Sequence, residues 1–365
     1  MKRFLFTLLI VVLGVSICLP ARAIYGVKMS DLHRTPVPTN PVRVWGHVMS
    51  EIPLRISDGG GEIEVTGVTA KPGDLLVLDG NWDGSKLSVI GAPRAFVGPA
   101  CIEMVYIAPG SFLMGNNGSE PNPNLNELPR HSVTLSAYWI GRYEVTHGQY
   151  RQFMEAGGYS HSSFWSTDGW TWKTNASRVQ PTYWSASQNW GPTPGPFTLT
   201  DNHPVCGVTY YEAEAFCKWA GGRLPTEAQW EKAARWSPVA GRANVYPWGD
   251  SWDPAKCNCS GDTLYPGYQV AAVGSYPAGA GCYGCMDMAG NVREWCRDWY
   301  STDYYSQTPA GGWVDPTGPS GGGLSYRSIR GGSYMTGDDS NRCAYRWELR
   351  EPTEAFACDG FRFAR

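Results

Sequence analysis

The stretch that decides the fold is Asp287-Met-Ala-Gly-Asn-Val-Arg-Glu-Trp295, in the last third of a chain of 365 residues. Downstream of it lie Arg330-Gly-Gly-Ser-Tyr334 and Gly360-Phe-Arg362, and upstream lies Gly222-Arg-Leu-Pro-Thr-Glu-Ala-Gln-Trp230. The chain also contains 44 Gly, 17 Trp and 20 Tyr. This composition indicates an irregular, loop-rich fold that is held together by aromatic packing and has few long helices.

These four blocks, read in order, resemble the formylglycine-generating enzyme family, also called the sulfatase-modifying factors. The resemblance covers residues 101–365. It implies a mixed α/β fold with low regular secondary structure, of the C-type-lectin-like kind that this family adopts. It also implies the family chemistry, in which an oxygen-dependent copper enzyme converts a sulfatase cysteine to formylglycine.

The copper ligands of that chemistry are missing from this sequence. In the enzymes that oxidise sulfatases, a pair of copper-binding cysteines follows the Gly-Gly-Ser-Tyr segment, and the matching positions here are Thr336 and Asn341. Monovalent copper is a soft ion that prefers thiolate ligands, so copper is not expected. Cys343 lies nearby, but it matches a structural half-cystine of the family. A lone reactive thiol is the alternative interpretation of Cys343.

The loop that follows Tyr334 is the candidate ligand site. Asp338 and Asp339 add negative charge to it. We expect a polar, acidic pocket between this loop and a Trp-rich insertion at 159–202, whose tryptophans either pack inside the fold or form a wall that faces the ligand. The candidate lining residues of the pocket are Ser333, Tyr334, Thr336, Asn341 and Arg346.

The resemblance implies two structural calcium sites. Calcium binds several side-chain and backbone oxygens on a tight loop. The first set of ligands matches the side chains of Asp287 and Glu294 and the backbone carbonyls of Gly290 and Val292. The residue pattern by itself is weak, because acidic residues in loops are usually solvated. A second site would use Asn258, the carbonyl of Cys259 and, in place of an aspartate that is missing here, Asp262.

The N-terminus predicts export. A basic start at Lys2 and Arg3 is followed by an apolar run and by the small-residue cleavage site Ala21-Arg-Ala23. We predict a signal peptide at 1–23, a Pro-rich linker at 24–41 and a soluble mature protein that is secreted or periplasmic. A membrane anchor is the alternative, but the apolar run is shorter than the ~20 residues that span a bilayer.

Export sets further expectations. Of the 11 cysteines, all but Cys18 follow the predicted cleavage site, and an oxidising compartment favours disulfides over metal thiolates. The net charge of −3 provides no electrostatic case for binding nucleic acid.

A small β domain is predicted at 42–92, ahead of the main domain at 101–365. Alternating apolar and polar residues mark five short strands, separated by Gly- and Asp-rich turns, at 42–48, 54–56, 62–65, 75–78 and 87–89. Strands at this spacing favour a small barrel similar to an OB fold. We interpret it as a spacer or a partner-binding module.

Three helices of the main domain are predicted by capping boxes. Thr146-His-Gly-Gln149, Thr209-Tyr-Tyr-Glu212 and Thr226-Glu-Ala-Gln229 each place a threonine three residues before a Glu or Gln. Apolar residues follow at helical spacing. Gly221-Gly222 is expected to end the second helix, where the left-handed conformation is needed.

Two functional classes remain. We favour an exported, non-catalytic binding or assembly module with a peptide, protein or glycan ligand, because Thr336 and Asn341 replace the copper cysteines. The alternative is a formylglycine-generating oxidase. Fold alone does not decide between them.

Overall fold

The computed structural model describes residues 42–51, 54–57, 62–66, 68–70, 74–82, 85–184, 199–260, 269–346 and 349–365. The predicted signal peptide at 1–23, the linker at 24–41 and the calcium candidate Asp262 lie outside these residues. Within the described ranges, no helix combines the length and the apolar character that crossing a membrane requires.

The first strands pair into a closed ring. They are β1 (Val42–Glu51), β2 (Leu54–Ser57), β3 (Glu62–Thr66), β4 (Leu75–Trp82) and β5 (Lys86–Val97), so all five predicted strands are confirmed. β1 pairs antiparallel with β2 and β4, β2 with β3, and β4 with β5, and the ring closes through parallel pairing of β3 with β5. Successive side chains on a strand point to opposite faces, and the buried ones include Ile56, Val65, Leu76, Leu78 and Leu87.

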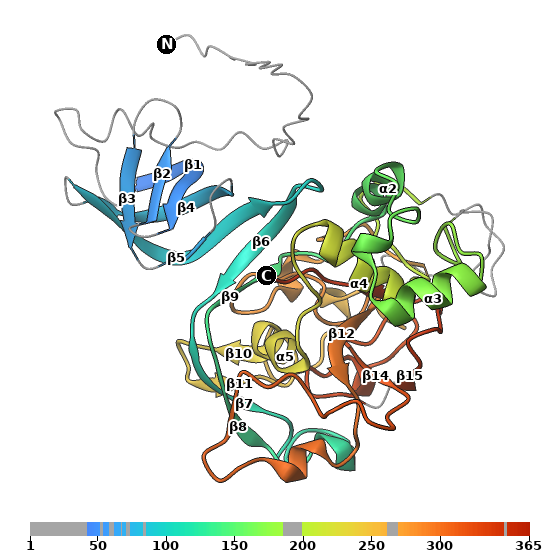
Figure 1. The fold of residues 1–365 in the computed structure, drawn as a ribbon. Helices are drawn as coiled ribbons and strands as arrows, with labels where there is room; N and C mark the ends of the chain where they lie inside the picture. The colour runs from blue at the N-terminus through green and yellow to red at the C-terminus, as the bar shows by residue number, and fades with distance from the viewer. Residues whose placement is uncertain are drawn as a thin grey trace.

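The sheet continues across the predicted boundary near residue 100. The second half of β5 pairs with β6 (Ile102–Ile107), and β6 pairs with β9 (Tyr138–Gly141), as the long strands in the middle of Figure 1 show. Trp139 Nε1 also donates a hydrogen bond of 2.7 Å to the carbonyl of Thr69. The two predicted domains therefore share one sheet, and one buried cluster contains residues of both.

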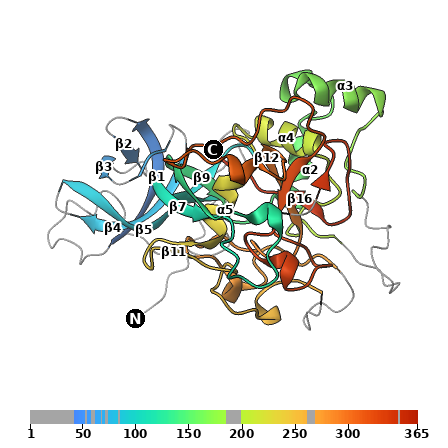
Figure 2. The same cartoon turned by 90° about the horizontal axis from the view of Figure 1, so that it is seen from below.

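The described residues contain four α-helices. They are α2 (His147–Glu155), α3 (Thr167–Asn175), α4 (Tyr210–Trp219) and α5 (Glu227–Arg235). The three predicted capping boxes, at Thr146, Thr209 and Thr226, are confirmed with both hydrogen bonds present in each. Gly221 has φ +84° directly after α4, as expected for a helix end. In Figures 1 and 2, α2, α3 and α4 lie at the end of the molecule opposite to the ring.

Most of the remaining chain consists of turns and short strands. One sheet has the order β13-β8-β7, and β10 pairs with β11. These strands are β7 (Gly110–Met114), β8 (His131–Leu135), β10 (Trp236–Ser237), β11 (Arg242–Ala243) and β13 (Trp313–Val314). The 3₁₀ turns are Leu125–Glu127, Ser162–Phe164, Pro254–Lys256, Pro277–Gly279, Tyr304–Gln307 and Asp339–Asn341. The fold is thus mixed α/β with few helices.

The last sheet joins the sequence blocks that suggested the family. Its order is β15-β14-β12-β16, from β12 (Arg293–Trp299), β14 (Arg327–Arg330), β15 (Leu349–Arg350) and β16 (Asp359–Phe361). Glu294 on β12 lies opposite Arg330 on one side and Gly360 on the other. The block that ends at Trp230, on α5, contacts this sheet through a hydrogen bond of 2.8 Å from Trp230 Nε1 to Glu294 Oε2.

Candidate functional site

The loop after β14 brings together the two positions that the resemblance assigns to copper cysteines. Thr336 Oγ1 accepts a hydrogen bond from the backbone N–H of Ser333 (2.7 Å) and lies 3.3 Å from Asn341 Oδ1. Asn341 Nδ2 donates to the carbonyls of Thr336 (2.9 Å) and Gly337 (2.7 Å). Both side chains therefore close the loop on itself.

Gly332 makes this packing possible. It has φ +66°, and a Cβ at this position would lie 2.2 Å from Asn341 Oδ1 and 2.8 Å from Thr336 Oγ1. Only glycine combines this backbone conformation with the absence of a side chain. The second glycine of the Arg-Gly-Gly-Ser-Tyr block is thus required by the close approach of the loop.

Ser333 and Tyr334 face the interior. Both side chains are buried, and Tyr334 packs in a small cluster with Cys206 and Cys358. The backbone N–H of Tyr334 donates to the carbonyl of Asn291 (2.9 Å), which ties the loop to the Asp287–Trp295 block. The two residues therefore pack beneath the loop, on its interior side.

Arg346, one of the candidate lining residues of the predicted pocket, is buried in the core. Its Nε and Nη2 donate to the two carboxylate oxygens of Glu227, at 2.9 and 3.0 Å. Its Nη1 donates to the carbonyls of Asn126 and Ser301. Four of the five N–H donors of this buried guanidinium are therefore used within the protein.

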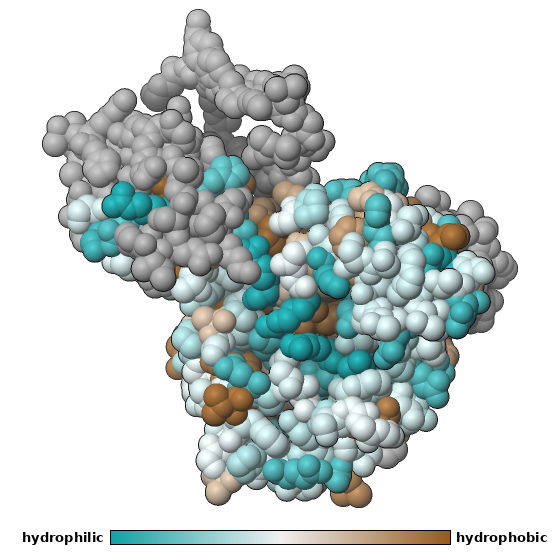
Figure 3. Space-filling model, viewed as in Figure 1, coloured by the Kyte–Doolittle hydropathy of each residue, from teal (hydrophilic) through white to brown (hydrophobic). Residues whose placement is uncertain are grey.

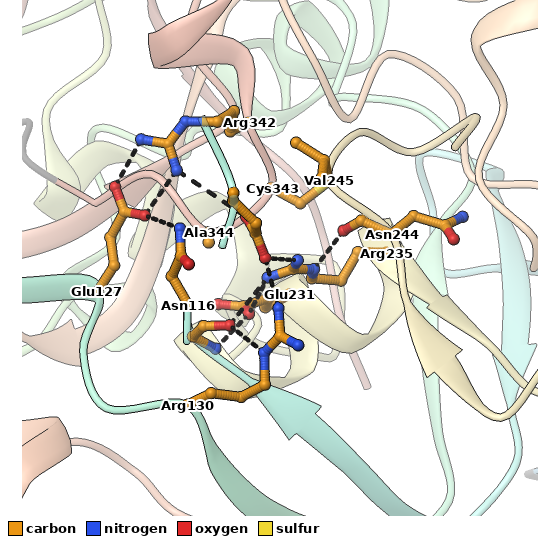
Figure 4. Close-up of polar contacts among 12 residues, drawn as sticks. Asn116, Glu127, Arg130, Glu231, Arg235, Asn244, Val245, Arg342, Cys343 and Ala344 are labelled. Carbon is orange, nitrogen blue, oxygen red and sulfur yellow. Dashed lines mark hydrogen bonds and ion pairs between the residues drawn. The ribbon is translucent and has the colours of Figure 1, made fainter. Parts of the chain in front are cut away.

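The same ion pair belongs to a network of buried charges that sequence reasoning missed. Glu231 accepts from Arg235 Nη1 (3.2 Å) and from Arg330 Nη2, and Arg235 also pairs with Glu120. A second pair, Arg342 with Glu127, lies beside them (Figure 4). The signal was present: Glu227, Glu231 and Arg235 follow at intervals of four residues on α5 and so share one face of the helix.

The predicted first calcium site holds an arginine instead of a free carboxylate pair. Glu294 Oε1 and Oε2 accept from Arg362 Nη2 (2.6 Å) and Nε (2.9 Å). The guanidinium of Arg362 therefore takes the place of a cation at Glu294. The predicted set of Asp287, Gly290, Val292 and Glu294 fits a calcium ion only in part.

Asp287 has a different acidic neighbour. It accepts a hydrogen bond of 2.6 Å from the backbone N–H of Gly274 and contacts Glu144. Burial and the charge of Glu294 raise the pKa of Asp287 to about 6. Burial and the charges of Asp287 and Glu294 raise the pKa of Glu144 well above its ordinary value. Within the described residues, Glu144 Oε2 has no hydrogen-bond partner. The structure thus forms a buried acid pair that the sequence did not predict.

The described ligands of the second calcium site support the backbone. Asn258 Nδ2 donates to the carbonyl of Gln269 (2.8 Å) and to Asn291 Oδ1 (3.0 Å). Cys259 is buried in a small cluster with Trp248 and Trp252, and Asp262 lies outside the described residues. Among the described residues, no group of three or more His, Cys, Asp or Glu side chains is arranged to hold a metal ion.

The predicted disulfides are not found at seven of the described cysteines. The structure contains free thiols at Cys206, Cys217, Cys282, Cys285, Cys296, Cys343 and Cys358. Cys343 packs with Cys285 and Cys296, in a different buried cluster from the one that contains Cys206 and Cys358. Cys343 is a buried free thiol in the structure, and its assignment as a half-cystine stays a prediction.

The tryptophans of the insertion pack inside the fold. Trp165 is buried, and Trp170, Trp172 and Trp184 are partly buried against the largest cluster. Trp184 also stacks on His147 with ring centroids 3.8 Å apart. For these residues the packing interpretation is confirmed, while Trp190 lies outside the described residues.

Comparison with known protein families agrees with this arrangement of the sequence blocks. The model of the sulfatase-modifying factor enzyme 1-like domain matches residues 93–365. The chain belongs to this family. The solved structure of PvdO from Pseudomonas aeruginosa has a similar fold, with a TM-score of 0.55 and 25% identity over 73% of this chain and 95% of that one.

Relatives in the sulfatase-modifying factor family carry names of different activities. The formylglycine-generating enzyme of Thermomonospora curvata is 35% identical over 290 residues, which cover 72% of this chain and 92% of that enzyme. Hercynine oxygenase of Mycolicibacterium smegmatis is 34% identical over 284 residues. The chain spans only 62% of the length of that hercynine oxygenase and 55% of the one from Mycolicibacterium thermoresistibile.

Proposed function

We propose that this member of the sulfatase-modifying factor family is an exported, non-catalytic protein that binds a peptide, protein or glycan or assembles with one. The observation that carries the proposal is the pair of Thr336 and Asn341, whose polar atoms are used to close their own loop. A hydroxyl and an amide provide no thiolate for monovalent copper. Without the metal, the oxidation of a sulfatase cysteine has no site in this loop.

Cys343 does not substitute for the missing pair. Its side chain is completely buried, and burial raises the pKa of its thiol to about 12. The thiolate, not the thiol, binds metal and attacks disulfides, so at neutral pH Cys343 is present in its unreactive form.

Restoring the two cysteines tests the proposal. Because Thr336 Oγ1 and Asn341 Oδ1 lie 3.3 Å apart, a Thr336→Cys/Asn341→Cys variant should place two sulfurs close enough to share one ion. We expect anaerobic titration with monovalent copper, in competition with bicinchoninate, to show about one tightly bound ion in the double variant and none in the wild type. Each single variant is the matched control and should bind far more weakly.

The formylglycine-generating oxidase is the alternative function, and the similarity to the Thermomonospora curvata enzyme over most of its length favours it. It predicts that the wild type binds one copper ion and converts a cysteine peptide to its aldehyde form, as followed by mass spectrometry. Either result, abolished by Cys343→Ser, would overturn the non-catalytic proposal. A double variant that gains no copper would show that Thr336 and Asn341 are not the cysteine positions.

Calcium at Asp287 is a further part of the proposal. A divalent cation between Asp287 and the unpartnered Glu144 Oε2, with the carbonyls of Gly290 and Val292, would stabilise the charged form of two carboxylates whose pKa burial raises. Glu294 joins such a site only if Arg362 leaves it. We include Asn258, Cys259 and Asp262 as the second site of the same proposal.

Thermal unfolding tests the calcium site. With calcium at 100 times its dissociation constant, the native state should gain about 2.7 kcal/mol over the protein in chelator. Asp287→Asn should remove this difference and leave the two melting curves superimposed, while Asp250→Asn, a change at an exposed aspartate, should preserve it. Identical curves of the wild type with calcium and with chelator would contradict the site.

We also propose that the β1–β5 ring is an OB-like barrel that serves as a spacer or partner-binding module, because a five-stranded Greek-key barrel is the OB architecture. The C-type-lectin-like description of residues 101–365 and the export of the protein belong to the same proposal. They rest on the family resemblance and on the sequence at 1–23.

A further inference from the structure

A cavity of about 410 Å³ lies where the ring meets the family domain. β6 and the turn at 108–111 form one wall, and α5, the residue after it and the turn at 281–284 form the other. On the face shown in Figure 3, hydrophobic residues form only small separate spots, so on this face no broad apolar patch competes as a ligand site. The volume of the cavity is within the range of small-molecule sites.

The cavity contains a buried ammonium group. Lys232 on α5 is only 2% exposed. Its Nζ donates hydrogen bonds of 2.9 Å to the carbonyls of Ala108 and Gly110. An ammonium has three donors, so one N–H remains for another partner. Burial lowers the pKa of Lys232 to about 8, so at neutral pH the group is still mostly charged.

The counterion of this lysine is missing. Across the described part of the chain, Lys232 makes no ion pair within 4 Å, and Asp315 acts on it only at longer range. By contrast, the buried arginines among the described residues each have a carboxylate partner in direct contact: Arg235, Arg330, Arg342, Arg346 and Arg362. A buried charge is costly unless it is paired and hydrogen-bonded, so an anion from outside would complete this site.

Aromatic side chains form the rest of the cavity. Tyr106, Trp236 and Tyr283 line it together with three prolines. Two of these rings are fixed by their neighbours, because Tyr106 packs on Trp139 with ring centroids 5.3 Å apart and Trp236 on Phe112 at 6.4 Å. Rings held in place lose little freedom when a ligand binds. The walls therefore suit a flat, apolar ring system.

We propose that this cavity is a binding site for an aromatic monoanion, such as an aromatic carboxylate, whose charge pairs with Lys232 and whose rings lie against Tyr106, Trp236 and Tyr283. None of its lining residues belongs to the loop at 333–346. The site is independent of the proposed function and of any metal.

Binding of 2-naphthoate and of its neutral isostere 2-naphthamide, measured by isothermal titration calorimetry at pH 7, tests the site. The wild type should bind naphthoate at least tenfold more tightly than naphthamide. Lys232→Met should abolish this preference, whereas Lys218→Met, a change at an exposed lysine of α4, should retain it. Tyr283→Leu should weaken both ligands. Above pH 8 the preference should decline, because Lys232 then loses its proton.

A second readout does not require a variant to fold. Cys282 is an exposed thiol that lines the same cavity, so bound naphthoate should slow its alkylation by iodoacetamide, as followed by peptide mass spectrometry, and naphthamide should do so much less. Equal protection by the two ligands, no protection, or an unchanged naphthoate preference in a folded Lys232→Met variant would overturn the proposal.

Discussion

Replacing Glu227 by alanine should lower the free energy of unfolding by about 3–5 kcal/mol, the cost of breaking a buried ion pair from one side. Glu227 accepts both hydrogen bonds of the Arg346 pair, and its Oε1 also accepts from Arg330 (3.1 Å). Burial by itself would raise the pKa of Glu227, but Arg346 and Arg330 hold it below its ordinary value. Alanine would leave Arg346 buried without a carboxylate.

The matched control is Glu155→Ala. Glu155 also lies on a helix, but its side chain is 67% exposed and its pairing with Arg151 is at 3.6 Å. Exposed pairs of this kind contribute about 0–1 kcal/mol. Chemical denaturation at pH 7 measures the loss of unfolding free energy in both variants relative to the wild type. Equal losses, or a loss below about 1 kcal/mol for Glu227→Ala, would show that the network does not hold the core together.

The second large effect is a pH dependence that originates at Asp298. This side chain is 3% exposed and accepts a hydrogen bond of 3.0 Å from the backbone N–H of Glu227. Burial, reinforced by the negative charge of Glu227, raises the pKa of Asp298 to about 7. The folded protein therefore binds a proton at Asp298 more tightly than the unfolded chain does.

The direction of the pH dependence follows from this difference in proton binding. The contribution of Asp298 to the free energy of unfolding is fully present below the pKa of an aspartate in the unfolded chain, near 4. This contribution is lost as the pH rises through about 7. A rise of this size corresponds to roughly 4 kcal/mol. Asp298→Asn keeps an acceptor for Glu227 without an ionisable group, so the variant should become more stable relative to the wild type between pH 4 and 7 by up to that amount.

Urea denaturation of the two proteins across this pH range measures the effect. Asp168→Asn, at an exposed position in the first turn of α3, is the control for the same change of residue type outside the core. A constant difference between Asp298→Asn and the wild type at every pH would mean that the carboxylate is not the group that titrates.

Much of the fold was predictable because its signals are local. Period-two alternation predicted each strand of the β1–β5 ring, and the capping boxes at Thr146, Thr209 and Thr226 predicted the starts of α2, α4 and α5. Such signals depend on residues within one or two turns of each other. The four ordered blocks identified the family because they are long enough to be specific.

The candidate site was predictable only in part. The sequence indicated that Thr336 and Asn341 lie in one loop, and the structure places them in contact. It did not indicate that Arg346 is buried against Glu227, since these residues are distant in the chain and nothing local distinguishes a buried arginine from a ligand-binding one. The four-residue spacing of Glu227, Glu231 and Arg235 placed these charges on one face of α5, but it did not indicate which residues they pair with.

By itself, then, the sequence determined the five strands of the ring, the starts of three helices, the family and the absence of cysteine from the loop, since these are properties of neighbouring residues. Only the tertiary structure decided which charges meet. It paired Glu294 with Arg362, left Asp287 beside Glu144 and placed Cys343 in a different buried cluster from Cys358. The physical reason is that ion pairs, disulfides and metal sites depend on distances of a few ångströms between residues far apart in the chain, which packing sets.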